Sequence, residues 1–264
     1  MVRHLPETLW CSAKHYAMLQ RDRPTGPVDE DAFAEILDAY DEDEVFVHVG
    51  LSDVSSAFEG NPYEFVVDHL DERFDAILTP AFTQSFRDSG YFHRKESEPE
   101  LGAFASLFFD DADYRTADPL HSIQVRGDYR FENCNHRDTF GPDGCYAKLD
   151  DDDVRIVNVG TRWLISTQIH YVERVMDVPY VETVDVEGTV YHGGGDHEQV
   201  AQTTYDKNKY LYYWDRLKLM RDLMTDGVLD HYDLNGLKVI SVSARDLRTA
   251  LEPRIEDDPY YVVK

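Results

Sequence analysis

The stretch VFVHVGLSDVSSAFEGNPYEFVVDHLDERFDAILTPAFT, residues 45–83, decides the fold class. It begins with a short apolar strand that ends at Gly50, continues into a helix with Pro62 in its first turn, and returns to a second strand over residues 75–83. A further helix is predicted just upstream, over residues 28–44. The order helix, strand, helix, strand is typical of an α/β layer fold, in which ligands bind beyond the carboxyl ends of the strands.

The rest of the chain extends this pattern. Residues 121–127 and 154–159 read as strands, and residues 178–192 alternate apolar and polar side chains around Glu187-Gly188, as an antiparallel hairpin does. An amphipathic helix is predicted over 210–227, followed by a strand and a last helix that ends before Pro253.

These elements predict one α/β domain over residues 1–264, with a central mixed sheet flanked by helices and an additional antiparallel β region. Within it we expect an N-terminal extension over residues 1–27. The β hairpin and a substrate loop are expected at about residues 178–209.

The charge is strongly one-sided, with 26 basic against 52 acidic side chains and a formal net charge of -26. Nucleic acid and anionic membranes are therefore excluded as partners. Repulsion among such charges is screened in molar salt, which favours a salt-rich cytoplasm. The first thirty residues contain no apolar run long enough for a signal peptide or a membrane span, so we expect a soluble cytoplasmic protein.

The three cysteines, an odd number, show neither disulfide nor metal-ligand spacing: Cys11, Cys134 and Cys145. Reduced thiols are the favoured interpretation, and a cysteine nucleophile is the weaker alternative. A second group of possible ligands surrounds three glycines: His192, Asp196, His197 and Glu198. Their spacing matches no metal motif, so a mobile substrate loop is favoured and no metal is expected.

Two strand ends carry candidate binding residues. Gly50, Ser52 and Ser55 stand where a strand turns toward a helix, and backbone N–H groups at such a turn can hold a phosphate, although an ordinary strand exit fits the spacing better. His121 and Ser122 resemble an activated nucleophile, but neighbours in a strand point to opposite faces. A partly buried histidine bonded to backbone is the favoured interpretation there.

The stretch STQIHYVERVMDVPY, residues 166–180, places His170 and Glu173 one helical turn apart after a buried strand. At the carboxyl edge of a sheet such a pair can act as a catalytic base and its helper. Spacing alone favours a surface contact between the two side chains.

Read in order from about residue 28 to the C-terminus, these segments resemble the aminoglycoside 3-N-acetyltransferase family. VHVGLSDVSSAFEG, residues 47–60, resembles the family's strand, His-x-Ser-Leu and glycine-rich turn, and LTPAFT, residues 78–83, resembles its Met-Pro-Thr-x-Thr strand end. STQIHYVERVMDVPY is similar to its Thr-x-x-His-x-x-Glu helix followed by Val-Pro-Tyr. Three departures are Gly50, where serine is usual, Asp118, where histidine is usual, and Glu59-Gly60-Asn61, which replaces a double glycine.

The resemblance implies an acetyl-CoA-dependent N-acetyltransferase acting on an amine of an aminoglycoside or related amino sugar, a small-molecule acceptor. It implies His170 as general base, with Glu173 orienting it or binding a second ammonium group. The implied CoA-binding residues are Gly50, Leu51, Ser52, Asp53, Val54, Ser55, Thr83, His121, Ser122, Thr139 and Gly141. The implied substrate-binding residues are Asp88, Asp196, Glu198 and Asp206. The alternative is a catalytically silent CoA-binding member with a structural or partner role.

Overall fold

A seven-stranded mixed sheet forms the centre of the computed structural model, which describes residues 5–21, 24, 26–208 and 211–263. The strand order is β4-β5-β2-β1-β6-β10-β9. β1 (Glu44–Val49) runs parallel to β2 (Ala76–Pro80) and to β6 (Arg155–Val159). The antiparallel pairs on either side involve β4 (Tyr114–Arg115), β5 (Ile123–Gly127), β9 (Asp230–Leu234) and β10 (Leu237–Ser243).

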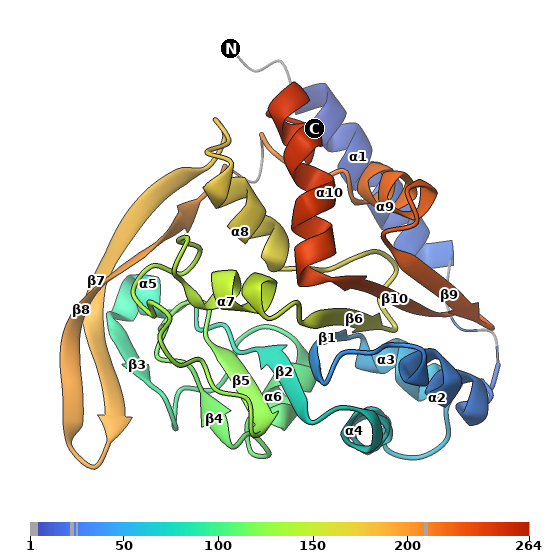
Figure 1. Ribbon diagram of the computed structural model, residues 1–264, viewed down its shortest axis with the longest axis horizontal. Helices are drawn as coiled ribbons and strands as arrows, with labels where there is room; N and C mark the ends of the chain where they lie inside the picture. Colours follow the sequence, from blue (N-terminus) through green and yellow to red (C-terminus); the bar gives the residue numbers. More distant parts are fainter. Residues whose placement is uncertain (1–4, 22–23, 25, 209–210, 264) are drawn as a thin grey trace.

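Helices cover both faces of this sheet, because alternate side chains of each central strand point to opposite faces. In β1, Phe46 packs into one core, whereas Val45 and Val47 pack into the other. The helices on the Phe46 side are α7 (Cys145–Asp151), α8 (Gln168–Val175), α9 (Arg216–Thr225) and α10 (Ala244–Asp257). Those on the other side are α2 (Glu30–Asp38), α3 (Leu51–Ala57), α4 (Pro62–Arg73) and α6 (Ala103–Phe108) (Figure 1).

A long hairpin forms a separate sheet at one side of the molecule (Figure 1). It consists of β7 (Glu182–Gly193) and β8 (Asp196–Asp206), and β3 (Tyr91–His93) pairs parallel with β7. The predicted fold class, a mixed sheet with helices and an additional antiparallel β region, is therefore confirmed.

The hairpin turn was placed wrongly by the alternation pattern. The chain reverses at residues 193–195, where all three glycines have positive φ. The four residues assigned to a mobile substrate loop all lie in the two strands instead: His192, Asp196, His197 and Glu198. Gly188 lies within β7, where a Cβ atom would stand 2.5 Å from Cζ of Phe86. This glycine therefore permits close packing and does not form a turn.

The last helix does not end before Pro253 as predicted, but continues to Asp257. Pro253 removes one backbone donor, yet the following turn buries Ile255 in the core, and the guanidinium of Arg254 donates to the carbonyl of Ala250 at 2.6 Å. The predicted helix over 210–227 is shorter, Arg216–Thr225, and residue 210 lies outside the described residues.

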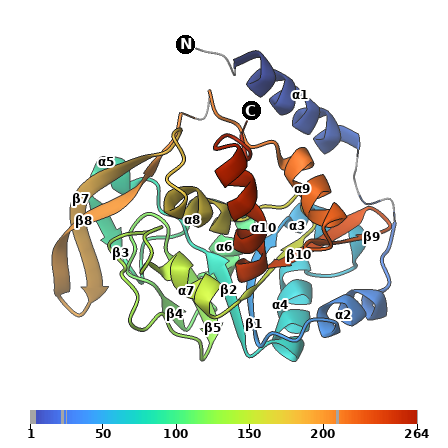
Figure 2. The same ribbon diagram turned by 45° about the horizontal axis from the view of Figure 1, so that its top comes forward.

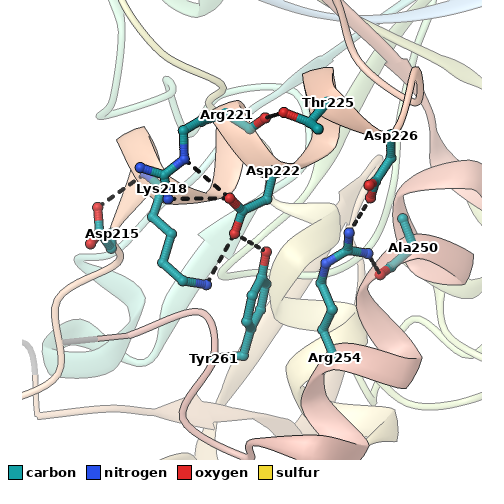
Figure 3. A network of polar contacts seen from close by, with 9 residues as sticks. All are labelled: Asp215, Lys218, Arg221, Asp222, Thr225, Asp226, Ala250, Arg254 and Tyr261. Atoms are coloured by element: carbon teal, nitrogen blue, oxygen red, sulfur yellow. Dashed lines mark hydrogen bonds and ion pairs between the residues drawn. The ribbon is translucent and has the colours of Figure 1, made fainter.

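Polar contacts join α9 to α10 and to the C-terminal segment (Figure 3). Asp222 of α9 accepts from the Tyr261 hydroxyl at 2.9 Å and pairs with Lys218 at 3.2 Å. At the end of α9, Asp226 pairs with Arg254 of α10. The C-terminal segment thus fastens α9 over the sheet face that also carries α8.

α1 (Leu5–Arg21) lies at the edge of the molecule beside α9 (Figure 2). The thiol of Cys11 contacts the carbonyl of Trp214 at 3.8 Å. Residues 1–4, 22–23 and 25 of the predicted N-terminal extension lie outside the described residues. Among the helices that the structure describes, none is long and apolar enough to cross a membrane.

Candidate functional site

The carboxyl end of β6 leads into the helix that carries the His-x-x-Glu pair. Gly160 has a φ of +69°, which lets the chain leave the strand sharply, and α8 begins at Gln168. His170 and Glu173 share one face of α8, and Nδ1 of the imidazole lies 2.7 Å from Oε2 of the carboxylate. Glu173 is only 1% exposed, so the interpretation of the pair as a surface contact is wrong.

The carboxylate of Glu173 accepts hydrogen bonds from several buried side chains. Its Oε1 accepts from Nε1 of Trp214 at 2.7 Å, from the Tyr180 hydroxyl at 3.1 Å and from Nζ of Lys207 at 3.3 Å. Burial alone would raise the pKa of Glu173, but the charge of Lys207 and the hydrogen bond from His170 outweigh burial and lower this pKa to about 2. The carboxylate is therefore ionised and can only accept hydrogen bonds.

The Glu173 carboxylate determines the tautomer of His170. Because an ionised carboxylate faces Nδ1, that nitrogen carries the hydrogen and Nε2 carries the lone pair. Nε2 faces the hydroxyl of Tyr205 at 2.8 Å, and the ring lies between those of Tyr205 and Trp214, with centroid distances of 4.1 and 4.4 Å. Burial lowers the pKa of His170 to about 4 despite the nearby carboxylate, so the imidazole is neutral at physiological pH.

A cavity of about 620 Å³ opens beside this network. Tyr180 and Lys207 belong both to its wall and to the surroundings of Glu173. Two acids, Glu182 and Asp206, also line it, and the remaining wall is formed by Pro179, Asn208 and Tyr212. The cavity is acidic and aromatic, which suits a cationic or hydroxyl-rich small molecule, and it meets the network around His170 through Tyr180 and Lys207.

The turn after β1 presents only some of the residues predicted to bind a cofactor. Ser52 and Ser55 of α3 are exposed and Leu51 is half-buried. Asp53 and Val54 instead point inward, and Asp53 pairs with Arg162 at 3.0 Å. Because the core and Arg162 already occupy the side chains of Asp53 and Val54, the predicted cofactor contact at these two positions would use their backbone N–H groups, and it stays a prediction.

A second group of predicted cofactor residues surrounds a buried arginine. The guanidinium of Arg115 donates to Oγ1 of Thr83 at 2.9 Å and to Oγ of Ser122 at 2.9 Å. Thr83 and Ser122 are 3% and 0% exposed, so they form part of an internal network and not an open binding wall. The Ser122 hydroxyl in turn donates to the carbonyl of Ala81 at 2.6 Å.

His121, Thr139 and Gly141 lie in a turn organised by Asp118. The Asp118 carboxylate accepts from the backbone N–H of His121 at 2.9 Å and from the Thr139 hydroxyl at 2.6 Å. Thr139 is thereby buried in an internal contact, and Gly141 packs against the side chain of Asp138. The ring of His121 contacts that of Tyr205, at a centroid distance of 5.7 Å, which links this turn to His170.

The four predicted substrate acids do not gather at His170. Asp88 is exposed on α5 (Phe86–Ser89), and Asp196 and Glu198 lie near the turn of the hairpin. At about 3.3 Å per strand residue, Glu198 lies about 23 Å along β8 from Tyr205. Glu198 is also engaged by Arg137 at 2.5 Å and by His192 at 3.0 Å. Only Asp206 lines the cavity beside Glu173.

Several residues of the site carried no signal in the sequence. Tyr205, Lys207 and Trp214 follow Glu173 by more than thirty positions, and no motif connects them to it. They meet the helix because the returning strand β8 ends beside α8, as Figure 1 shows. Arg115 was missed for the same reason, since its partners come from three separate segments.

Comparison with known protein families identifies one that matches most of the chain. The sequence model described as aminoglycoside 3-N-acetyltransferase matches residues 46–256, well over half of the chain. Among curated protein sequences, no match is significant.

Solved structures share the fold at low sequence identity. The aminoglycoside acetyltransferase AAC(3)-Xa is 18% identical, with a TM-score of 0.69, over 93% of this chain and 98% of that one. AAC-IIIb, solved as a binary complex with CoASH, is 14% identical, with a TM-score of 0.70, over 88% and 97% of the two chains. Sisomicin-bound AAC-VIa is 19% identical, with a TM-score of 0.67, over 86% and 99%.

Proposed function

Because the chain belongs to the aminoglycoside 3-N-acetyltransferase family, we propose that it transfers the acetyl group of acetyl-CoA to an amine of an aminoglycoside or a related amino sugar. Membership of this family identifies the chain as an acyltransferase. The observation that carries the proposal is the buried His170–Glu173 pair beside an acidic cavity. The CoASH and sisomicin complexes of the two structural neighbours support the classes of donor and acceptor.

His170 acts as the general base in this proposal. The acceptor nitrogen attacks the carbonyl carbon of the thioester, its proton passes to Nε2 of His170, and the C–S bond breaks. The CoA thiolate leaves and takes up that proton, so no acetyl-enzyme forms. In the resting site the Tyr205 hydroxyl is hydrogen-bonded to Nε2, and the incoming amine replaces it.

Glu173 is a positioning residue in this scheme, since it holds the hydrogen on Nδ1 and leaves the Nε2 lone pair available. The acceptor binds in the cavity of about 620 Å³, where Glu182 and Asp206 pair with its ammonium groups. Acetyl-CoA approaches from the exposed serines of α3, Ser52 and Ser55.

Replacement of His170 tests the catalytic role. His170→Gln should lower kcat for acetyl transfer at least about 100-fold, the lower bound of a general-base contribution. CoA affinity should stay close to that of the wild type, because the imidazole acts on the acceptor. Thiol release from acetyl-CoA would be followed with a panel of aminoglycosides and amino sugars at high salt.

The matched control is His197→Gln, since this histidine is exposed near the distant hairpin turn. Full activity in His170→Gln would remove the mechanism. If the wild-type protein binds CoA but releases no thiol from acetyl-CoA with any acceptor, the chain is the catalytically silent member described as the alternative.

The double variant Ser52→Ala/Ser55→Ala tests the cofactor site and should weaken CoA binding. An unchanged CoA affinity would mean that the two serines do not contact the cofactor.

A further inference from the structure

Two of the three cysteines meet beside a histidine in the segment between β5 and α7. Sγ of Cys134 lies 3.0 Å from Sγ of Cys145, which in turn lies 3.2 Å from Nδ1 of His136. One ligand atom from each of the three residues lies within 4.8 Å of the other two. The sequence alone favoured reduced thiols, because the three cysteines show neither disulfide nor metal-ligand spacing.

The backbone closes this segment into a compact loop. The N–H of Asn135 donates to the carbonyl of Asp143 at 2.6 Å, and Asn135 forms a β-bridge with Gly144. Cys145 is buried at the start of α7, whereas Cys134 and His136 are half-buried. The protein therefore brings three soft or borderline ligands together and leaves one side accessible to solvent.

We propose that Cys134, His136 and Cys145 bind one Zn²⁺ ion, with water as the fourth ligand. Thiolate and imidazole are the ligands that Zn²⁺ prefers, whereas Mg²⁺ and Ca²⁺ take oxygen ligands. A disulfide between the two cysteines would not explain why the imidazole of His136 lies beside them, whereas a metal site uses all three side chains. The acetyl transfer proposed above involves no metal, so this site is structural and stands independently of that function.

The ion would clamp the loop that carries Thr139 and Phe140. Phe140 contacts the rings of His121 and His170, with centroid distances of 5.2 and 5.6 Å. Metal binding should therefore stabilise the wall of the candidate site at Phe140, without supplying a reacting group.

Metal titration tests the site. Protein freed of metal by a chelator and kept reduced would be titrated with Zn²⁺, and with Co²⁺ as a spectroscopic probe. We expect one equivalent to bind, with the visible bands of tetrahedral cobalt and a thiolate charge-transfer band. Loss of a hydrogen-bond partner of a ligand already weakens metal affinity about 10- to 100-fold, so Cys134→Ser and His136→Asn should each weaken it about 100-fold or more.

His197→Gln is the matched control, since this exposed histidine near the hairpin turn belongs to neither cluster of possible metal ligands that the described residues form and should leave the titration unchanged. A variant that fails to fold is replaced by a second measurement on the wild type, in which Zn²⁺ should protect Cys134 and Cys145 from alkylation. Two outcomes would overturn the proposal: reduced protein that binds no Zn²⁺, or an affinity for Zn²⁺ that is unchanged in both ligand variants.

Discussion

Burial forces the pairing of charges around Glu173. The side chain of Lys207 is 10% exposed and that of Glu173 is 0% exposed, so water stabilises neither charge well. Each charge is instead compensated by the other. The ammonium also lies 4.3 Å from the ring centroid of Trp214. Removing one partner of such a pair leaves an uncompensated buried charge, which costs more than the pair itself contributes.

Glu173→Gln should therefore lower the free energy of unfolding by about 3–5 kcal/mol, because the charge of Lys207 loses its partner. The double variant Glu173→Gln/Lys207→Met should regain at least half of that loss, since it buries no ammonium. Urea unfolding of the wild type, both single variants and the double variant measures this coupling. Simple additivity of the two single changes would contradict it.

His48 gives a second prediction at the level of one residue. It is 9% exposed on β1, its Nε2 has no partner in the described structure, and burial lowers its pKa to about 3. The unfolded chain binds this proton near pH 6.5, so the contribution of neutral His48 to stability is present above that pH. It is lost as the pH falls from about 6.5 toward 3.

Comparison with His48→Gln isolates this effect. Between pH 6 and 4.5 the free energy of unfolding of the wild type should fall, relative to the variant, by about 1.4 kcal/mol per pH unit. Denaturant titrations at several pH values would measure the difference. A difference that does not change with pH would mean that His48 is protonated to the same extent in both states.

The sequence predicted the centre of the candidate site but not its surroundings. His170 and Glu173 lie on one helix, so their spacing already gave their common face. The pattern could not give their burial, which depends on Tyr205, Lys207 and Trp214 arriving from a strand and a loop far along the chain. The pattern also gave no sign that Thr83 and Ser122 are buried, because Arg115, their common partner, lies outside every motif.

At the level of elements, the junction of β1 with α3 accounts for one departure from the family pattern. The N–H of Gly50 donates to the carbonyl of Val159 at 2.8 Å, which holds the ends of β1 and β6 together. A Cβ atom at Gly50 would overlap the carbonyl oxygen of Gly160. The glycine that replaces the usual serine here is thus required by the close approach of two strand exits.

Restoring the serine should consequently destabilise the protein. Gly50→Ser should lower the free energy of unfolding by about 1–3 kcal/mol, the usual cost of overpacking, because backbone atoms must shift. Gly26→Ser is the matched control, since a Cβ atom there would meet nothing within 4 Å. Equal stability of the two variants would show that the junction opens freely.

Local patterns predicted elements well where the buried side chains form a continuous apolar run or repeat at helical spacing. β1, β2 and β6 lie where short apolar runs placed them, because these strands are buried on both faces, and α4 lies where its helical repeat of buried side chains placed it. The hairpin turn was misplaced because Gly188 serves packing against Phe86, and a pattern cannot distinguish that glycine from a turn glycine. The strand order of the central sheet depends on long-range pairings and had no local signal.

At the scale of the whole molecule, the net charge of -26 opposes the compact state. Ion pairs offset part of this repulsion, for example Arg155 with Glu42 at 2.5 Å and Arg254 with Asp226. Exposed pairs contribute only about 0.2–1 kcal/mol each, and twice as many acids as bases leave many carboxylates with no basic partner available. Salt weakens both the ion pairs and the repulsion between carboxylates. Because acids outnumber bases, we expect the loss of repulsion to have the larger effect on stability.

The melting temperature should therefore rise as KCl is increased from about 0.1 to 3 M, while the screening length falls from about 10 Å to below 3 Å. Thermal unfolding followed by circular dichroism measures this directly. Sucrose at matched osmolality controls for general exclusion of solutes, and it should give a smaller rise because it does not screen charge. A melting temperature that stays flat or falls with KCl would mean that the ion pairs dominate, and the inference of a salt-rich cytoplasm would lose its physical basis.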